Sequence, residues 1–385
     1  MGTAYTPGLT VSARTRVEKL RRLPLKGTVL VKEGQTVLPD AIVARTELPG
    51  LMQTVKVAER MGIEPGDLES ALRVKVGDRV AEGDVIAETK GLFGRFFKSE
   101  FRSPAGGTVE LISPTTGHVG IREAPTPVEK DAYIQGTVTR IIPEEGVAIA
   151  CEGALVQGIF GVGGERRGVI TVVVVGADQP LTDTMLTEAH RGKIVVGGSN
   201  VSGAALRKAA EMGVVGIVVG GVVDRELMDY LAAALKQPGF DIGVAITGHE
   251  PIPFTLVITE GFGTIRMADR TFALFKSLEG KMASINGATQ IRAGVIRPEV
   301  IVPLADAPTG AALSDAGEES GQLTIGTPIR VIREPYFGIL GKVTALPSEL
   351  VKVESETMVR VLEASLEDGR AVTVPRANVE IIETA

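Results

Sequence analysis

Two adjacent residues, His249 and Glu250, are the pair in this sequence best suited to proton transfer. A histidine titrates near neutral pH, and a neighbouring carboxylate can orient it for general acid or base work. The pair follows an apolar stretch that we expect to be a strand, and ligand sites of α/β proteins commonly lie after strands. His118 and His190 are scattered, and no His-x-x-x-His pattern or nucleophile elbow accompanies the pair. The sequence thus has no recognisable catalytic motif, and hydrogen bonding within a loop is the alternative role.

A glycine-rich loop between a predicted strand and a predicted helix could bind an anion. Its candidate ligand-binding residues are Gly197, Gly198, Ser199, Asn200 and Ser202. Backbone N–H groups and the helix dipole attract negative charge at such a position. The loop lacks the lysine of a P-loop and does not match Gly-x-Gly-x-x-Gly. The alternative is structural, since the serines can cap the helix and the glycines permit close packing of strand and helix.

Aromatic and basic residues alternate between residues 90 and 102. The segment holds four of the eleven phenylalanines, Phe93, Phe96, Phe97 and Phe101, together with Lys90, Arg95, Lys98 and Arg102. Four basic residues against Glu100 give a net charge of +3, whereas the whole chain carries −6. Such a segment can stack on bases while neutralising phosphates, or it can dock into a partner protein. In the alternative, the rings cover the β core and the cations stay in water.

Composition indicates a folded, strand-rich protein of two to four domains. The 385 residues are 44% hydrophobic and 23% charged, and they include 47 glycines but only 4% aromatic residues and no tryptophan. This balance favours turns and β-branched strands. The negative net charge argues against a general nucleic-acid binder, because that affinity depends on phosphate neutralisation.

Cysteine usage and the apolar runs favour a cytoplasmic protein. Cys151 is the single cysteine, so a disulfide within the chain is impossible, and we expect an inert buried thiol. The N-terminal residues lack the apolar centre of a signal peptide. The longest apolar runs, GVITVVVVG and GVVGIVVGGVV, are far shorter than a membrane span and are rich in valine. We interpret them as buried strands and expect no membrane contact.

An internal repeat organises the N-terminal part of the chain. VKEGQTVLPDAIVART at 31–46 and VKVGDRVAEGDVIAET at 74–89 superpose at an offset of 43 residues. Each copy predicts a strand, a glycine turn, a second strand, another turn and an apolar strand. We expect two similar β units that lie side by side in one β domain, residues 1–168.

The second copy, followed by SPAGGTVELI at 103–112, resembles the barrel-sandwich hybrid fold of biotinyl and lipoyl domains. In that family a hairpin presents the lysine that carries the prosthetic group. Phe96 stands at the lysine position here, and the hairpin is about three residues longer in this alignment. The comparison therefore implies no covalently attached cofactor, with Lys90 and Lys98 as displaced alternatives.

The pattern changes at residue 169, where apolar strands begin to alternate with helical segments. Helices are predicted at 202–212, 224–236 and 267–280, and this alternation is typical of βαβ units with a parallel sheet. The architecture resembles a small swivelling or flavodoxin-like α/β domain. This domain is expected to span 169–304, although the partner of the β segments after 280 remains open.

A small, polar and acidic stretch at 305–322 predicts a flexible linker to a last domain at 323–385. The segment GTPIRVIREPYFGILGKVTAL at 326–346 resembles the KOW motif, and the following strands and the Asp-Gly turn complete the length of an SH3-like barrel. The resemblance implies partner contacts around Arg333, Tyr336 and Phe337. Residues 326–385 hold seven basic and nine acidic residues, which favours protein over RNA as the partner. A purely structural barrel is the alternative.

The sequence therefore predicts a multidomain α+β and α/β protein with three open hypotheses. The first is a non-catalytic binding or assembly protein that engages protein partners through its KOW and β domains. The second is an enzyme or enzyme subunit, whose pocket would join the glycine loop to Thr247, His249 and Glu250. The third, a transcription- or ribosome-associated factor, follows from the KOW resemblance alone.

Overall fold

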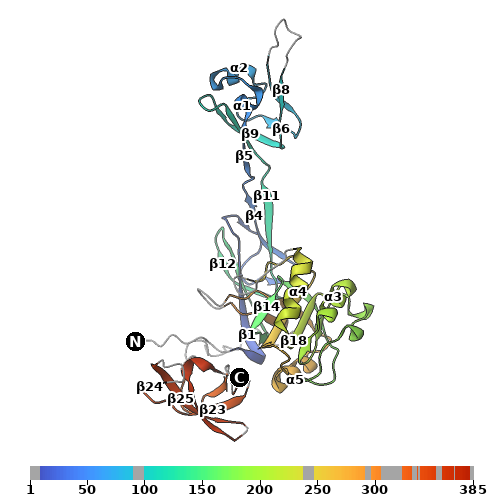
Figure 1. Cartoon of the computed structure of the whole chain (residues 1–385), viewed down its shortest axis with the longest axis vertical. Helices are drawn as coiled ribbons and strands as arrows, with labels where there is room; N and C mark the ends of the chain where they lie inside the picture. Colours follow the sequence, from blue (N-terminus) through green and yellow to red (C-terminus); the bar gives the residue numbers. More distant parts are fainter. Residues whose placement is uncertain are drawn as a thin grey trace.

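The computed structural model describes residues 9–89, 99–236, 247–290, 296–304, 323–331, 336, 339–352, 358–367 and 369–381. This part of the chain is mostly β, with one large mixed sheet, several small antiparallel sheets and five α-helices. The predicted combination of β-rich and parallel α/β structure is confirmed at this level. Figure 1 shows an elongated molecule in which a small unit stands away from the body on two long strands. No helix among the described residues is long and apolar enough to span a membrane.

The large sheet runs through most of the body and contains twelve described strands. Their order along the sheet is β14 (Phe160–Val162), β19 (Thr255–Phe262), β18 (Gly216–Val222), β16 (Lys193–Val196), β15 (Arg166–Val172), β20 (Met282–Asn286), β21 (Glu299–Pro303), β13 (Gly146–Gln157), β12 (Gly136–Ile142) and β3 (Thr36–Val37). Two further strands join it, β1 (Val11–Arg22) on β13 and β17 (Asn200–Val201) on β18.

Four neighbouring strands, β15, β16, β18 and β19, are parallel, as the alternating pattern predicts. Helices α3 (Gly203–Met212) and α4 (Asp224–Leu235) cover one sheet face, where Leu206 and Leu231 pack with Val195 and Ile217. Helix α5 (Asp269–Ser277) covers the opposite face and packs with a second set of strand residues. Strand β18 of the second valine-rich run is buried on both faces because helices cover both, whereas the first run, 168–176, is only partly buried and Val175 is 84% exposed. All three predicted helices are confirmed.

Strands β20 and β21 are the β segments after residue 280, whose pairing partners could not be assigned from the sequence. β20 pairs with β15, β21 pairs with β13, and the two pair with each other. The antiparallel strands of the N-terminal part and the parallel strands therefore belong to one continuous sheet. The domain boundary at 168 and 169 stays a prediction, but the sheet runs through it.

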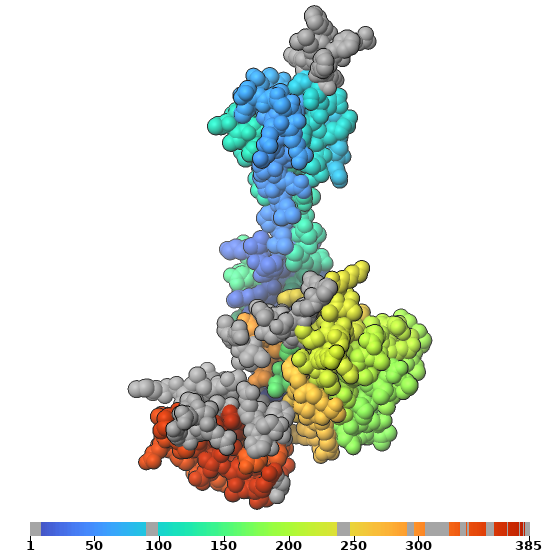
Figure 2. All heavy atoms as spheres, viewed as in Figure 1, coloured from blue at the N-terminus to red at the C-terminus, as the bar shows by residue number. Residues whose placement is uncertain are grey.

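The N-terminal part contains two β units with separate cores. The basal unit comprises β1, β2 (Thr28–Val29), β3, β4 (Ile42–Leu48), β11 (Thr126–Asp131), β12 and β13. The distal unit, residues 52–122, comprises β5 (Met52–Lys56), α1 (Val57–Met61), α2 (Leu68–Ala71), β6 (Arg79–Val80), β7 (Val85–Glu88), β8 (Glu100–Arg102), β9 (Gly107–Ser113) and β10 (His118–Arg122). The two cores share no buried residue. The paired strands β4 and β11 form the ribbon that carries the distal unit (Figures 1 and 2).

The two sequence repeats, expected to form similar β units side by side in one domain, contribute to two separate cores. Val37 and Val43 of the first copy belong to the basal core, whereas Val80 and Ile86 of the second copy belong to the distal core. The two units share corresponding backbone hydrogen bonds and register shifts. The second unit is inserted into a hairpin of the first, because the chain leaves the basal unit along β4 and returns along β11.

The backbone hydrogen bonds of the two units correspond at the repeat offset. Gly34 N–H donates to Val138 O in the basal unit (2.8 Å), and Gly77 N–H donates to Val109 O in the distal unit (2.7 Å). In return, Val138 N–H donates to Gln35 O and Val109 N–H donates to Asp78 O. Both returning strands begin with Gly-Thr-Val, at 107–109 and 136–138. The duplication thus includes a later strand that the sequence repeat of 31–46 and 74–89 does not cover.

The hairpins of the two units also correspond. The pairing of β4 with β11 shifts register between Ala44 and Ile42, and that of β7 with β8 shifts at the equivalent place, between Ala87 and Val85. Further out, Thr46 pairs with Val128, and Thr89 N–H donates to Ser99 O (2.9 Å). In the first copy, the distal unit is inserted between the two hairpin strands β4 and β11. In the second copy, residues 90–98 connect the equivalent strands β7 and β8.

The C-terminal unit, residues 323–381, is an antiparallel sheet with its own core. Its strands are β22 (Pro328–Val331), β23 (Leu340–Ala345), β24 (Leu350–Lys352), β25 (Met358–Leu366), β26 (Ala371–Pro375) and β27 (Val379–Ile381). Ile329, Val331 and Val343, which the sequence places on strands, are buried in it. Gly369 closes the turn between β25 and β26 with a φ of 86°. The predicted linker at 305–322 lies outside the described residues.

Candidate functional site

The two halves of the predicted enzyme pocket lie at opposite ends of the parallel strands. β18 pairs with Asn200 through Gly221 at its carboxyl end and with Thr255 through Gly216 at its amino end. Five residues of extended strand span about 16 Å. His249 and Glu250 precede Thr255 and therefore stay near the amino end. The convergence on which the enzyme hypothesis depends is absent from these described residues.

Glu250 has a local structural role. Its carboxylate accepts hydrogen bonds from the backbone N–H groups of Gly163 (2.8 Å) and Gly248 (2.9 Å). His249 is exposed beside it. These contacts agree with the alternative of loop hydrogen bonding, because they satisfy two backbone donors next to the amino end of β19. The strand predicted before Thr247 falls mostly on residues 237–246, outside the described residues.

At the glycine loop 197–202, backbone N–H groups at the start of helix α3 donate hydrogen bonds to side chains of the chain itself. Ser202 Oγ accepts from Ala205 N–H (3.1 Å), which makes Ser202 the N-cap of α3. The Glu226 carboxylate accepts from Gly203 N–H (2.6 Å). A negative charge from α4 therefore already lies where an anionic ligand was expected.

The glycines of this loop are explained by close packing. A Cβ at Gly198 would lie 2.4 Å from Gln179 O and 2.6 Å from Gly176 O, so only glycine fits without a backbone shift. Asn200 donates from Nδ2 to Thr264 Oγ1 (3.3 Å). Ser199 Oγ and Asn200 Oδ1 are buried without a hydrogen-bond partner.

Of the residues predicted to contact partners, most lie outside the described residues. These are Phe93, Arg95, Phe96, Phe97, Lys98, Arg333 and Phe337, together with Lys90. Tyr336 is described, and it is half-buried against the C-terminal core with the Arg370 guanidinium 5.1 Å from its ring centre.

The flanks of the basic aromatic segment are well defined. β7 pairs with β8, and Ser99 N–H donates to Thr89 Oγ1 (2.9 Å), so the two ends of segment 90–98 meet. Phe101 is buried in the distal core, with the Arg60 guanidinium 6.0 Å from its ring centre. Phe101 therefore follows the alternative in which the ring belongs to the core. The ends of the segment lie on the side of the distal unit away from the body (Figure 1).

A buried cluster of charges that the sequence did not reveal joins the basal unit to the parallel strands. Arg21 on β1 is 4% exposed and donates to both carboxylate oxygens of Glu165, at 2.6 and 2.7 Å. It also donates to Asp131 Oδ1 at the base of the ribbon (2.8 Å), and Arg167 pairs with the same carboxylate. Nearby, Lys19 pairs with Glu299 at 2.5 Å. Arg21 lies on the buried face of β1, and its partners come from distant parts of the chain.

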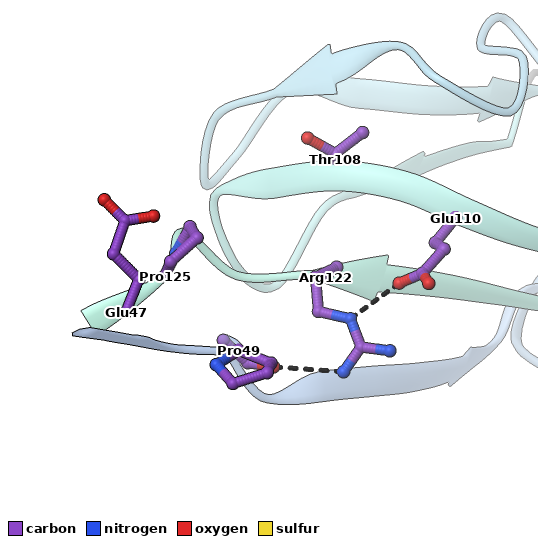
Figure 3. A pocket seen from close by; sticks show the side chains of 7 residues that line it. Glu47, Pro49, Thr108, Glu110, Arg122 and Pro125 are labelled. Carbon is purple, nitrogen blue, oxygen red and sulfur yellow. Dashed lines mark hydrogen bonds and ion pairs between the residues drawn. The ribbon is translucent and has the colours of Figure 1, made fainter. Parts of the chain in front are cut away.

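A hollow of about 430 Å³ lies where the ribbon meets the distal unit (Figure 3). Its lining residues are Glu47, Pro49, Gly50, Thr108, Glu110, Arg122 and Pro125. Arg122 Nε donates to Glu110 Oε2 (2.6 Å), and its Nη1 donates to Gly50 O (3.1 Å). None of these residues was predicted to form a site, because they come together only when β9 pairs with β10 and β4 pairs with β11.

Two features of the described residues concern metal binding and thiol reactivity. No group of three or more His, Cys, Asp or Glu side chains there could hold a metal ion. Burial, with a smaller contribution from Glu152, raises the pKa of Cys151 to about 11, so the reactive thiolate is scarce at neutral pH.

Comparison with protein-family models and with curated proteins found no match to this chain.

Proposed function

We propose that the protein is a non-catalytic binding or assembly protein that contacts a protein partner through the outer end of its distal unit. One observation supports this most: β7 and β8 hold Thr89 and Ser99 together at the outer end of a unit with its own core. Residues 90–98 connect these two ends and include Phe93, Phe96 and Phe97. The fold thus offers an aromatic segment on a firmly paired base.

A protein partner agrees better than RNA with the charges and residue types. Phenylalanine and arginine are enriched in the cores of protein interfaces. The chain as a whole carries −6, which opposes the phosphate neutralisation that RNA affinity requires. The segment's own +3 charge instead favours an acidic patch on a protein.

We further propose that both β units belong to the barrel-sandwich hybrid class. Their matching turns, register shifts and Gly-Thr-Val strands support a common fold. Because Phe96 occupies the position of the family's lysine, the proposal includes no biotinyl or lipoyl group. The intact mass of natively expressed protein tests this point, and added mass on Lys90 or Lys98 would refute it.

For the C-terminal unit we propose an SH3-like barrel of the KOW type that makes a second protein contact. The order of its six strands and the burial of Ile329, Val331 and Val343 support this assignment. A role in transcription or on the ribosome depends on this likeness alone. The enzyme hypothesis is the weaker one, because His249 and the glycine loop lie at opposite ends of the parallel strands.

Affinity purification of the tagged full-length protein from its native cells tests the binding proposal. The variant Phe96→Ser with Phe97→Ser removes two rings of the segment. The control is Val76→Ser, because Val76 is an apolar residue of the distal unit that is 60% exposed. We expect the double variant to lose proteins that the wild type and the control both retain. Equal recovery by all three would exclude the segment as the contact.

A further inference from the structure

The ladder of hydrogen bonds that forms the ribbon is thin just below the distal unit, where the one backbone bond between the described strands of the connection runs from Glu123 N–H to Leu51 O (3.0 Å). Pairing of β4 with β11 ends at Leu48 and Thr126, and pairing of β5 with β10 begins at Met52 and Arg122. The neck between them consists of residues 49–51 and 123–125. Pro49 and Pro125 lie in this neck, one in each segment, and neither can donate a backbone hydrogen bond. A two-stranded connection is weakest where its ladder is thin.

Arg122 ties the neck to the distal sheet. Its side chain starts on β10, contacts Glu110 on β9 through Nε and reaches Gly50 O in the neck through Nη1. Gln53 Nε2 also donates a hydrogen bond to Glu123 Oε1 in the neck (2.6 Å). Backbone contact is also close here, since a Cβ at Gly50 would lie 2.0 Å from Glu123 O. One arginine therefore links β9 and its own strand β10 to the backbone that would have to bend.

The hollow beside the neck provides the space for bending. The ribbon and neck contribute Glu47, Pro49 and Pro125 to one side, and the distal unit contributes Thr108 and Arg122 to the other (Figure 3). Bending toward this side closes the hollow. Arg122 and Glu110 keep 36% and 50% of their side-chain surface exposed, so water and salt weaken their attraction.

We propose that the neck is a hinge about which the distal unit swings, and that Arg122 is the residue that restrains it. The hinge orients the outer end of the distal unit over a range of directions relative to the body. This inference goes beyond the proposed binding function and stands without it, because it concerns motion in the free protein. Salt loosens the restraint by screening the ion pair of Arg122 with Glu110.

Distances between two spin labels in the full-length chain test the hinge. Labels are attached at Val76→Cys in the distal unit and Glu129→Cys on the ribbon, both exposed, in a Cys151→Ser background. We expect Arg122→Ala to widen the distance distribution about twofold, with Arg122→Lys in between. About 1 M salt, where the Debye length is about 3 Å, should widen the distribution of the wild type.

Arg102→Ala is the matched control, because Arg102 on β8 is an exposed arginine that also contacts a carboxylate, Glu100, and a backbone carbonyl, Gly83 O, but lies outside the sheet that joins the neck. It should leave the distribution unchanged. Circular dichroism melting checks that each variant is folded, and Glu110→Gln serves as a second probe of the same restraint. Equal widths in wild type, Arg122→Ala and Glu110→Gln would overturn the proposal, whether the shared distribution is narrow or broad.

Discussion

Gly34 and Gly77 occupy the same position in two copies of one β unit. Both have a left-handed backbone, with φ of 79° and 98°, and both donate a hydrogen bond to the valine of a Gly-Thr-Val strand. One copy is inserted into the other, so the same turn stabilises the basal unit in one case and the distal unit in the other.

Alanine at either glycine should cost about 1 kcal/mol of local stability, because an L-residue is strained at positive φ. We expect Gly77→Ala to speed hydrogen exchange in 52–122 and Gly34→Ala to act on the basal unit. Gly66→Ala is the control, since its backbone is not left-handed and no atom lies within 4 Å of the added Cβ. Exchange that rises throughout both units for either variant would show that the two cores unfold as one.

Arg21 should be among the most stabilising charges of the basal unit. Arg21→Ala leaves the carboxylates of Glu165 and Asp131 without their buried partner, which should cost about 3–5 kcal/mol. Arg16→Ala on the same strand removes an exposed arginine 3.9 Å from Glu18 and should cost less than about 0.5 kcal/mol. Denaturant unfolding compares the two variants. Similar losses for both would mean that the buried cluster contributes little.

The same cluster should make stability depend on pH in the acid range. Burial disfavours the charged form of Glu165, but hydrogen bonds and charge from Arg21, helped by Lys130 and Lys19, outweigh it and lower the pKa of this carboxyl. The stabilisation is therefore full above the unfolded-state pKa of about 4.3 and is lost as the pH falls through the folded-state value. Glu165→Gln should flatten the decline in unfolding free energy below about pH 5. An unchanged slope would assign the acid sensitivity to other carboxylates.

Local features were well predicted from the sequence. Periodicity located α3, α4 and α5, and the repeated glycines located the turns at Gly34 and Gly77. These features depend on residues close in the chain, for which composition and spacing carry the information. The second Gly-Thr-Val at 136–138 was a usable signal of the longer duplication, and it was missed.

Long-range arrangement was harder to predict. Nothing in the spacing of the repeats says which later strand completes each unit, so nesting and adjacency are equally compatible with an offset of 43 residues. His249 was predicted to follow a strand that falls mostly outside the described residues, and the described strand next along the chain is β19, which follows it. Arg21 and Arg122 likewise reach groups that are far away in the chain, Glu165 for Arg21 and Gly50 for Arg122.

The most direct test of the account is to remove the outer segment while keeping its paired base. Residues 90–98 are replaced by Asn-Gly, a two-residue turn suited to an antiparallel hairpin, between the hydrogen-bonded Thr89 and Ser99. Proteins that co-purify with the full-length chain after ribonuclease treatment are then quantified for the wild type and the short-turn variant. The account predicts an unchanged melting temperature and the loss of at least one protein that the wild type retains. Unchanged recovery of every co-purifying protein by a folded variant would contradict it.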